Sequence, residues 1–166
     1  MALSMYQASV PVFVKTLGNL SAILDKAAAF AAAKKVDPSV LLGYRLAPDM
    51  FNLTRQVQLV SDHAKRASAR LAGVEAPVYE DTETSISELK ARIDKTLAYI
   101  KTFKPAQIDG SETREITLKF GTSSQTFQGQ PYLLHNALPN FFFHAATAYA
   151  ILRHCGVDVG KKDFIG

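Results

Sequence analysis

Few side chains of this 166-residue chain combine metal-ligating, acid–base and nucleophilic chemistry: four histidines and one cysteine. They are His63, His135, His144, His154 and Cys155. An imidazole can ligate a metal ion, line a pocket, or lie in a core with its ring nitrogens hydrogen-bonded. His144 poses this choice most directly, because it lies in the middle of LPNFFFHAATAYAILRHCG (residues 138–156), the most apolar stretch of the chain.

The other candidates have weaker support from their positions. His154 is expected to point away from the apolar stripe of its helix and to be exposed. His135 precedes that helix in a loop, where it either contributes to a pocket or has no role. Cys155 follows at the C-terminal end of the helix, whose negative dipole end disfavours a thiolate, so we expect no nucleophilic role. Gly121 and Gly129 belong to a hairpin region and do not form a phosphate loop.

Amphipathic helices are expected to position these side chains. In four segments the apolar residues recur at alternating steps of four and three, the seam that is typical of a bundle helix. The first segment predicts a helix over about 2–34, with a kink at Pro11 because proline removes a backbone donor. Asp37-Pro38 is a cap followed by the proline favoured at a first helical position, which predicts a short helix over 38–43.

Three more long helices follow in the sequence. The first is predicted to start at Pro48 and to end at Gly73. The next starts with the capping box Ser85–Glu88 and stops at Pro105, and the last starts at Pro139 and ends at Gly156. Between the last two, Ile116, Leu118 and Phe120 alternate with polar residues before a glycine–serine turn, a pattern that predicts a small β-hairpin. The tail, residues 157–166, carries enough apolar side chains to dock back on the bundle.

These elements indicate an all-α fold, a four-helix bundle with a small β-hairpin inserted before the last helix, as one domain over residues 1–166. The connections are long for a simple up-down bundle, which favours a crossover topology. A chain of this length buries a sizeable core, so folding requires no metal. The composition, 48% hydrophobic and 20% charged, is that of a globular protein.

Composition and charge also bound the partners and the location. The single cysteine fits a reducing compartment, and the N-terminus lacks the features of a signal peptide, so we expect a cytoplasmic protein. No stretch has the roughly 18 uninterrupted apolar residues of a membrane span, and no membrane partner is expected. The net charge of +4 is spread in small clusters without interleaved aromatic residues, which argues against nucleic-acid binding.

Two segments, LLGYRLAPDMFNLTRQVQLV and ALPNFFFHAATAYAILRHCGVDVGKKDFIG, resemble the DinB/YfiT-like helical bundles, and within them an uncharacterised bacterial and fungal subfamily. The resemblance implies an up-up-down-down four-helix bundle that is often dimeric. It also implies, for many members, a divalent metal held by one histidine of the second helix and an i, i+4 pair of the fourth. Some such members are thiol-dependent transferases or isomerases, and others are hydrolases.

The resemblance places this metal set on positions that are only partly histidine. His144 matches the first member of the pair, whereas the second falls at Ala148, whose methyl group cannot ligate a metal. In the second helix the matching position is Leu59, and His63 lies one turn later, about 40° away on a helical wheel. Asp62 projects opposite the core stripe and is a poor replacement. The metal candidates are therefore His144 and His63, for zinc or nickel, in a set that lacks a ligand.

The other interpretation of His144 is a buried ring satisfied by a hydrogen bond, with Gln56 or His63 as the partner. A pocket between the second and fourth helices would then include Gln56, Leu59 and Ala148. We accordingly predict a small-molecule-binding or self-associating protein with a degenerate metal site and no cofactor. The alternative is a zinc- or nickel-dependent transferase or hydrolase, so whether the protein is an enzyme stays open at this stage.

Self-association is predicted from Phe141, Phe142 and Phe143. Three successive helical residues face different directions, so at least one of these rings meets a partner helix or the hairpin instead of the bundle core. A homodimer is therefore expected.

Overall fold

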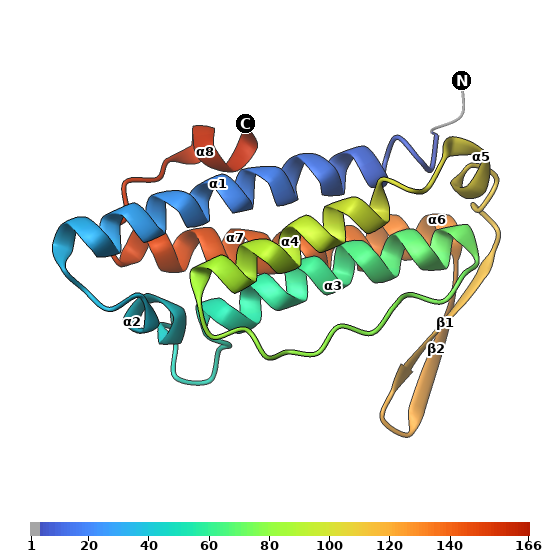
Figure 1. Cartoon of the computed structure of the whole chain (residues 1–166). Coiled ribbons are helices and arrows are strands. Elements are labelled where there is room, and N and C mark those ends of the chain that lie inside the picture. Colours follow the sequence, from blue (N-terminus) through green and yellow to red (C-terminus); the bar gives the residue numbers. More distant parts are fainter. Residues whose placement is uncertain (1–3) are drawn as a thin grey trace.

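Four long helices form the body of the molecule (Figure 1). They are α1 (Val10–Lys34), α3 (Leu53–Ala72), α4 (Ile86–Ile100) and α7 (Leu138–His154). The shorter elements are α2 (Pro38–Gly43), α5 (Pro105–Ile108), β1 (Glu115–Phe120), β2 (Ser123–Gln128), α6 (Gly129–Tyr132), the π-helical turn η1 (Leu133–Ala137) and α8 (Lys161–Ile165). This computed structural model describes residues 4–166, with the side chain of Phe120 left aside.

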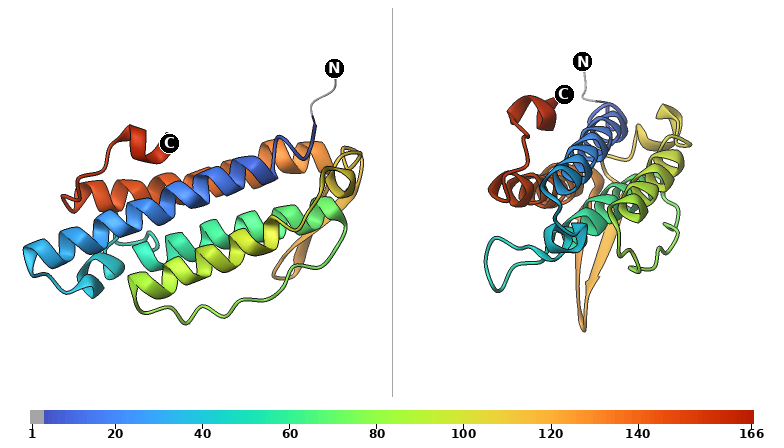
Figure 2. Two further views of the ribbon diagram at one scale, coloured as in Figure 1. Left: turned by 45° about the horizontal axis from the view of Figure 1, so that its top comes forward. Right: turned by 60° about the vertical axis from the view of Figure 1, so that its left-hand side comes forward.

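The long helices are arranged so that α3 packs on both α7 and α4, and α1 packs on α4 (Figure 2). α1 and α7 run in one direction, while α3 and α4 run in the other (Figure 1). This up-down-down-up order differs from the up-up-down-down order that the resemblance implies. The consecutive helices α3 and α4 can be parallel only if the chain between them returns along the bundle. Residues 74–84 do this, and we call them the crossover strap. The result is the mostly helical fold with one two-stranded sheet that the sequence predicts.

The core lies where the helix seams meet. Phe13 of α1 and Phe141 of α7 pack edge to face, with ring centroids 4.8 Å apart. Both rings are fully buried, as are Leu17, Val57 and Ile93 from the seams of three helices. Burial of side chains of this size contributes about 1.5–3 kcal/mol each. The predicted apolar seams therefore form the core.

The first helix begins later than predicted. The expected start at Ala2 lies outside the described residues, and residues 5–9 form turns, with α1 starting at Val10. Pro11 occupies the first turn, where its missing N–H needs no partner, so the predicted kink at Pro11 is wrong. A proline placed nine residues into a helix would clash with the preceding turn, which explains the later start.

The start of α3 also differs from the prediction. Pro48 lies in a turn closed by a hydrogen bond from Met50 N to the Ala47 carbonyl, 3.0 Å long. The helix begins at Leu53, because the side chain of Asn52 accepts from Arg55 N at 3.0 Å and caps it. The fixed φ of proline suits a turn as well as a helix start. The prediction that Pro48 opens this helix is therefore wrong, whereas its predicted end at Gly73 is confirmed.

Other local predictions are confirmed. The short helix α2 spans Pro38–Gly43, and the side chain of Asp37 accepts from Ser39 N at 2.8 Å. The capping box of α4 forms, with Ser85 and Glu88 bonding reciprocally. Pro105, however, does not end α4, which closes at Ile100; it begins the short α5.

The hairpin and the last helix are joined without a break. β1 and β2 pair antiparallel, and α6 and η1 lead directly into α7. Gly129 at the root of the hairpin must be glycine, because an added Cβ would lie 1.9 Å from the Ser111 carbonyl oxygen. Pro139 begins α7 as predicted, although His135 lies in η1 and not in a loop. The wider π turn directly precedes Pro139, which cannot donate a helical hydrogen bond.

The C-terminal tail docks as predicted. α8 lies along α1 (Figure 2), and Asn19 donates to the Phe164 carbonyl at 3.0 Å. Lys26 pairs with Asp163 at 2.7 Å. Over residues 4–166, no helix has the length and apolar character that crossing a bilayer requires.

A buried charge network joins α3, α4 and the crossover strap. Asp62, expected to face away from the core, is buried, because the strap and α4 cover that side of α3. Its Oδ1 lies 2.9 Å from Lys65 and 3.0 Å from Arg92, and its Oδ2 lies 2.9 Å from Arg66. Burial raises the pKa of this carboxyl, but the hydrogen bond from Lys65 and the charges of Arg66, Lys65 and Arg92 lower it below its ordinary value.

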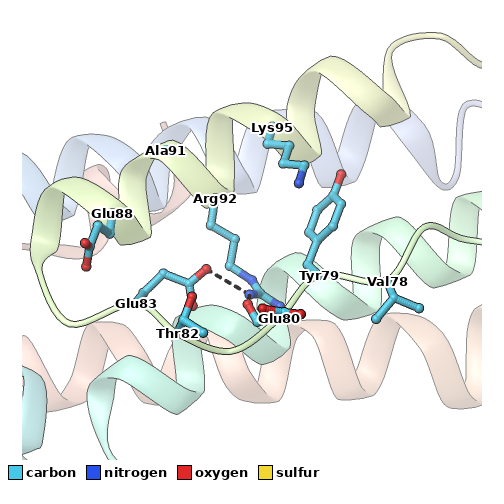
Figure 3. Close-up of a pocket in the computed structure, with 9 residues that line it drawn as sticks. All are labelled: Val78, Tyr79, Glu80, Thr82, Glu83, Glu88, Ala91, Arg92 and Lys95. Carbon is cyan, nitrogen blue, oxygen red and sulfur yellow. Dashed lines mark hydrogen bonds and ion pairs between the residues drawn. The ribbon is translucent and has the colours of Figure 1, made fainter.

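Arg92 fastens the strap to this network (Figure 3). Its guanidinium contacts Asp81 and Glu83, both at 2.9 Å, and donates to the Glu80 carbonyl at 2.9 Å. The Tyr79 ring lies against Lys65, whose Nζ is 3.8 Å from the ring centroid. A buried guanidinium with this many acceptors fixes the path of the strap over α4.

We predict that Arg92→Ala lowers the free energy of unfolding by about 3–5 kcal/mol, because it leaves Asp62 and Glu83 short of a buried partner. Urea unfolding measures the loss, and limited proteolysis within residues 74–84 should become faster. The exposed Lys101→Ala control should stay within about 0.5 kcal/mol of the parent. A loss for Arg92→Ala below about 1 kcal/mol would show that the network is not structural.

Candidate functional site

His63 and His144 meet between α3 and α7. Their rings stack with centroids 5.3 Å apart and planes inclined by 16°. His144 is buried, with 9% of its surface exposed, and His63 is half-buried. The antiparallel packing of α3 on α7 brings together these two residues, which are 81 positions apart in the sequence.

The hydrogen bonds of His144 define its tautomer. Gln56 donates from Nε2 to the Phe51 carbonyl at 3.2 Å, so its Oε1 faces His144 as an acceptor. His144 Nδ1 lies 2.8 Å from that oxygen and must therefore donate, which leaves its Nε2 unprotonated in the neutral ring. The prediction of a buried, hydrogen-bonded His144 is confirmed, and of the two partners left open, Gln56 and His63, the bond is to Gln56.

Both rings are held in their neutral form at neutral pH. Burial lowers the pKa of His63 from its ordinary 6.5 to about 4, and the charges of His144, Arg66 and Arg70 act in the same direction. Burial also lowers the pKa of His144, with a further contribution from the charge of Arg55. The histidine pair is thus surrounded by cations.

A cavity of about 280 Å³ opens beside His63. Its walls come from α3, from β1 of the hairpin, and from the junction of η1 with α7. The lining residues are Leu59, Asp62, His63, Arg66, Arg70, Leu118, Lys119, Asn136 and Asn140. The insertion of the hairpin before the last helix therefore closes a space that four helices alone would leave open.

The cavity wall carries an excess of positive charge. Three cations line it, Arg66, Arg70 and Lys119, against the single carboxylate of Asp62. Arg70 donates to Tyr132 Oη at 3.0 Å, a neutral partner. Asp62 pairs with Arg66 at 2.9 Å but is shared with Lys65 and Arg92 of the buried network, so it does not neutralise Arg70 and Lys119.

The other residues considered in the sequence lie in different places. Leu59 lines the cavity, whereas Gln56 and Ala148 are buried between α3 and α7. His154 is exposed, as expected, and its Nε2 lies 3.0 Å from Tyr44 Oη. Burial raises the pKa of the Cys155 thiol, which disfavours the thiolate.

The metal set implied by the DinB/YfiT resemblance does not fit the residues present. The i+4 partner of His144 is Ala148, and the Nδ1 of His144 already bonds Gln56. Arg66 and Arg70 beside His63 would repel a divalent cation. Over the described part of the chain, no group of three or more His, Cys, Asp or Glu side chains is arranged to hold a metal ion.

Six residues of the cavity were not predicted from the sequence as site residues: Arg66, Arg70, Leu118, Lys119, Asn136 and Asn140. Arg70 could have been found, because it lies seven positions after His63 and therefore on the same face of one helix. Lys119 lies on a strand whose packing against α3 no local pattern predicts. The asparagines reach the cavity through the π turn, which the sequence analysis did not anticipate.

The comparisons with known proteins agree with the fold. Residues 5–165 match the family described as "Domain of unknown function (DUF1993)". A crystal structure of a DinB family member protein from Shewanella denitrificans is 47% identical and superposes with a TM-score of 0.92. That match covers 97% of this chain and 91% of the other. A search of curated proteins finds no match. The resemblance to an uncharacterised DinB-like subfamily is confirmed.

The lowered pKa of His63 predicts a pH-dependent stability. The unfolded chain protonates His63 near pH 6.5, whereas the folded chain keeps it neutral to about pH 4. The unfolded chain therefore binds more protons within that window, and the free energy of unfolding falls as the pH decreases through it. Between about pH 7.5 and pH 5, the free energy of unfolding of His63→Gln should therefore fall by about 2 kcal/mol less than that of the parent.

Urea unfolding at the two pH values measures this difference. His135→Gln removes an exposed histidine and is the matched control, which should retain the pH dependence of the parent. Identical pH dependence in the parent and in His63→Gln would contradict the low pKa.

Proposed function

Since this chain belongs to the DUF1993 family, a domain of unknown function with a DinB-like structure, we propose that it binds a small molecule without a metal ion. The binding site is the cavity beside His63. The observation that carries the proposal is the cavity itself, walled by three elements and lined by both polar and apolar side chains.

The size and lining of the cavity support this assignment. At about 280 Å³ it is slightly smaller than typical ligand pockets, which run from about 300 to 1,000 Å³, so it suits a small metabolite. Leu59 and Leu118 supply an apolar wall, and the charged and amide groups supply orientation. The site lies beside the position where the resemblance implies a metal, so this family member would use the same region of the bundle for a different ligand.

The alternative is the divalent-metal-dependent transferase or hydrolase implied by the resemblance. One observation favours it, the convergence of His63 and His144 from α3 and α7 with the Nε2 of His144 available as an acceptor. Two histidines without a third protein donor are a weak zinc or nickel site, and the neighbouring arginines weaken it further. We therefore favour the metal-free function.

One further expectation belongs to this proposal. The free Cys155 supports a location in a reducing compartment such as the cytoplasm.

The exposed rings on α7 support self-association as a homodimer. Phe141 is buried in the core, whereas Phe142 and Phe143 are 36% and 56% exposed. We predict that light scattering detects a species of twice the 18.1 kDa chain mass, and that Phe143→Ser shifts it toward the monomer. Val78→Ser, at an apolar residue that is 90% exposed on the strap, is the control. A monomeric parent at high concentration would contradict the dimer.

The ligand proposal predicts two results for protein purified without a histidine tag. Metal analysis should find less than about 0.1 equivalent of zinc or nickel, since a set without its third ligand binds weakly. In NMR screening, compounds from a fragment library of neutral, cationic and anionic molecules should shift the signals of Leu59, His63 and Asn140. Leu59→Trp, which fills the cavity, should abolish these shifts.

The control is Leu46→Trp, at an exposed leucine outside the cavity, which should leave fragment binding intact. Stoichiometric zinc or nickel that is lost in His144→Ala would favour the metal-dependent alternative. A library with no compound that shifts the cavity signals would contradict a binding function at this site.

A further inference from the structure

We infer that the ligand of this cavity is a small organic anion, a carboxylate or phosphate ester with a compact apolar part. The inference rests on the proposed function and deepens it by naming the ligand class. The anionic group would lie among Arg66, Arg70 and Lys119, and the apolar part would lie against Leu59 and Leu118.

The cations of the cavity lack the carboxylates that would neutralise them. Among the residues that the structure describes, neither Arg70 nor Lys119 forms an ion pair with a carboxylate. Arg66 has one, to Asp62, and that carboxylate is shared with Lys65 and Arg92. A partly enclosed space with this charge balance favours an anion over a neutral or cationic ligand.

The positions of the cations suit one anionic group. Arg66 and Arg70 are four residues apart in α3, so both project from the same face of that helix. Lys119 comes from β1 on another wall of the cavity. Two guanidinium groups and an ammonium group that converge from two elements can bind separate oxygens of a carboxylate or phosphate.

The third wall of the cavity adds uncharged polar groups. Asn136 and Asn140 lie one turn apart at the junction of η1 with α7, and Asn140 Nδ2 donates to the Asn136 carbonyl at 2.7 Å. Their amides can orient a ligand without adding charge. Leu59 and Leu118 line another part of the same space, which is why an anion with an apolar body fits better than an inorganic ion.

Phenyl phosphate is the probe for this inference, and benzamide is the neutral probe with the same ring. Isothermal titration calorimetry in about 50 mM salt, where screening is moderate, should detect phenyl phosphate and little or no benzamide. Arg70→Gln should weaken phenyl phosphate binding about tenfold or more, because it removes a charge-assisted contact. Lys119→Gln should weaken it about threefold, since that side chain is exposed.

Lys101→Gln is the matched control, with the same loss of charge at an exposed site away from the cavity, and should bind like the parent. Lys119 makes no buried contact, so its variant keeps the test valid if Arg70→Gln does not fold. Benzamide binding in the cavity as tightly as phenyl phosphate would overturn the anion inference and leave the proposed binding function intact. Phenyl phosphate binding that neither cavity variant weakens would also overturn it.

Discussion

The carboxylate of Asp62 is the interaction on which the rest of the structure depends. Because α3 and α4 are parallel, residues 74–84 must return along the bundle, and an unsupported segment of that length would be costly to order. Asp62 holds Lys65 and Arg92 in place, and Arg92 in turn binds the strap through Asp81 and Glu83. Such a buried charge is tolerated only because it has three cationic partners, so it fixes one arrangement of α3, α4 and the strap.

The same carboxylate determines the electrostatics of the neighbouring cavity. Since its charge is shared among three cations, it cannot also neutralise Arg70 and Lys119 on the cavity wall. Burial and the charges of Arg66 and Arg70 lower the pKa of His63, and these charges also disfavour a metal cation at that ring. Where the resemblance implies a metal site, the proposed site of this chain has a charge balance that disfavours a cation.

The sequence predicted the parts of the molecule that depend on local patterns or on one helical face. The apolar seams and the capping box of α4 follow from residue spacing, and helical periodicity narrows the partner of His144 to Gln56 or His63. The helical wheel of α3 alone could not show that Asp62 is buried, because the strap that covers it is not part of that helix. Proline gave ambiguous signals, since Pro11 and Pro48 suit a helix start, a kink or a turn equally, and neighbouring caps such as Asn52 decide among these.

The cavity escaped prediction for a more general reason: it forms only where irregular parts of the fold meet α3. Lys119 and Leu118 come from the inserted hairpin, Asn136 lies in the π turn, and Asn140 follows that turn in α7. Regular helices in a bundle bury their seams against one another and leave little space, so a site forms where that packing is interrupted. The hairpin and the π turn interrupt it at the same end of α7, and the arginines of α3 face the space between them. The irregular elements thus create the space of the site, the helix α3 supplies most of its charged groups, and the apolar seams determine the fold.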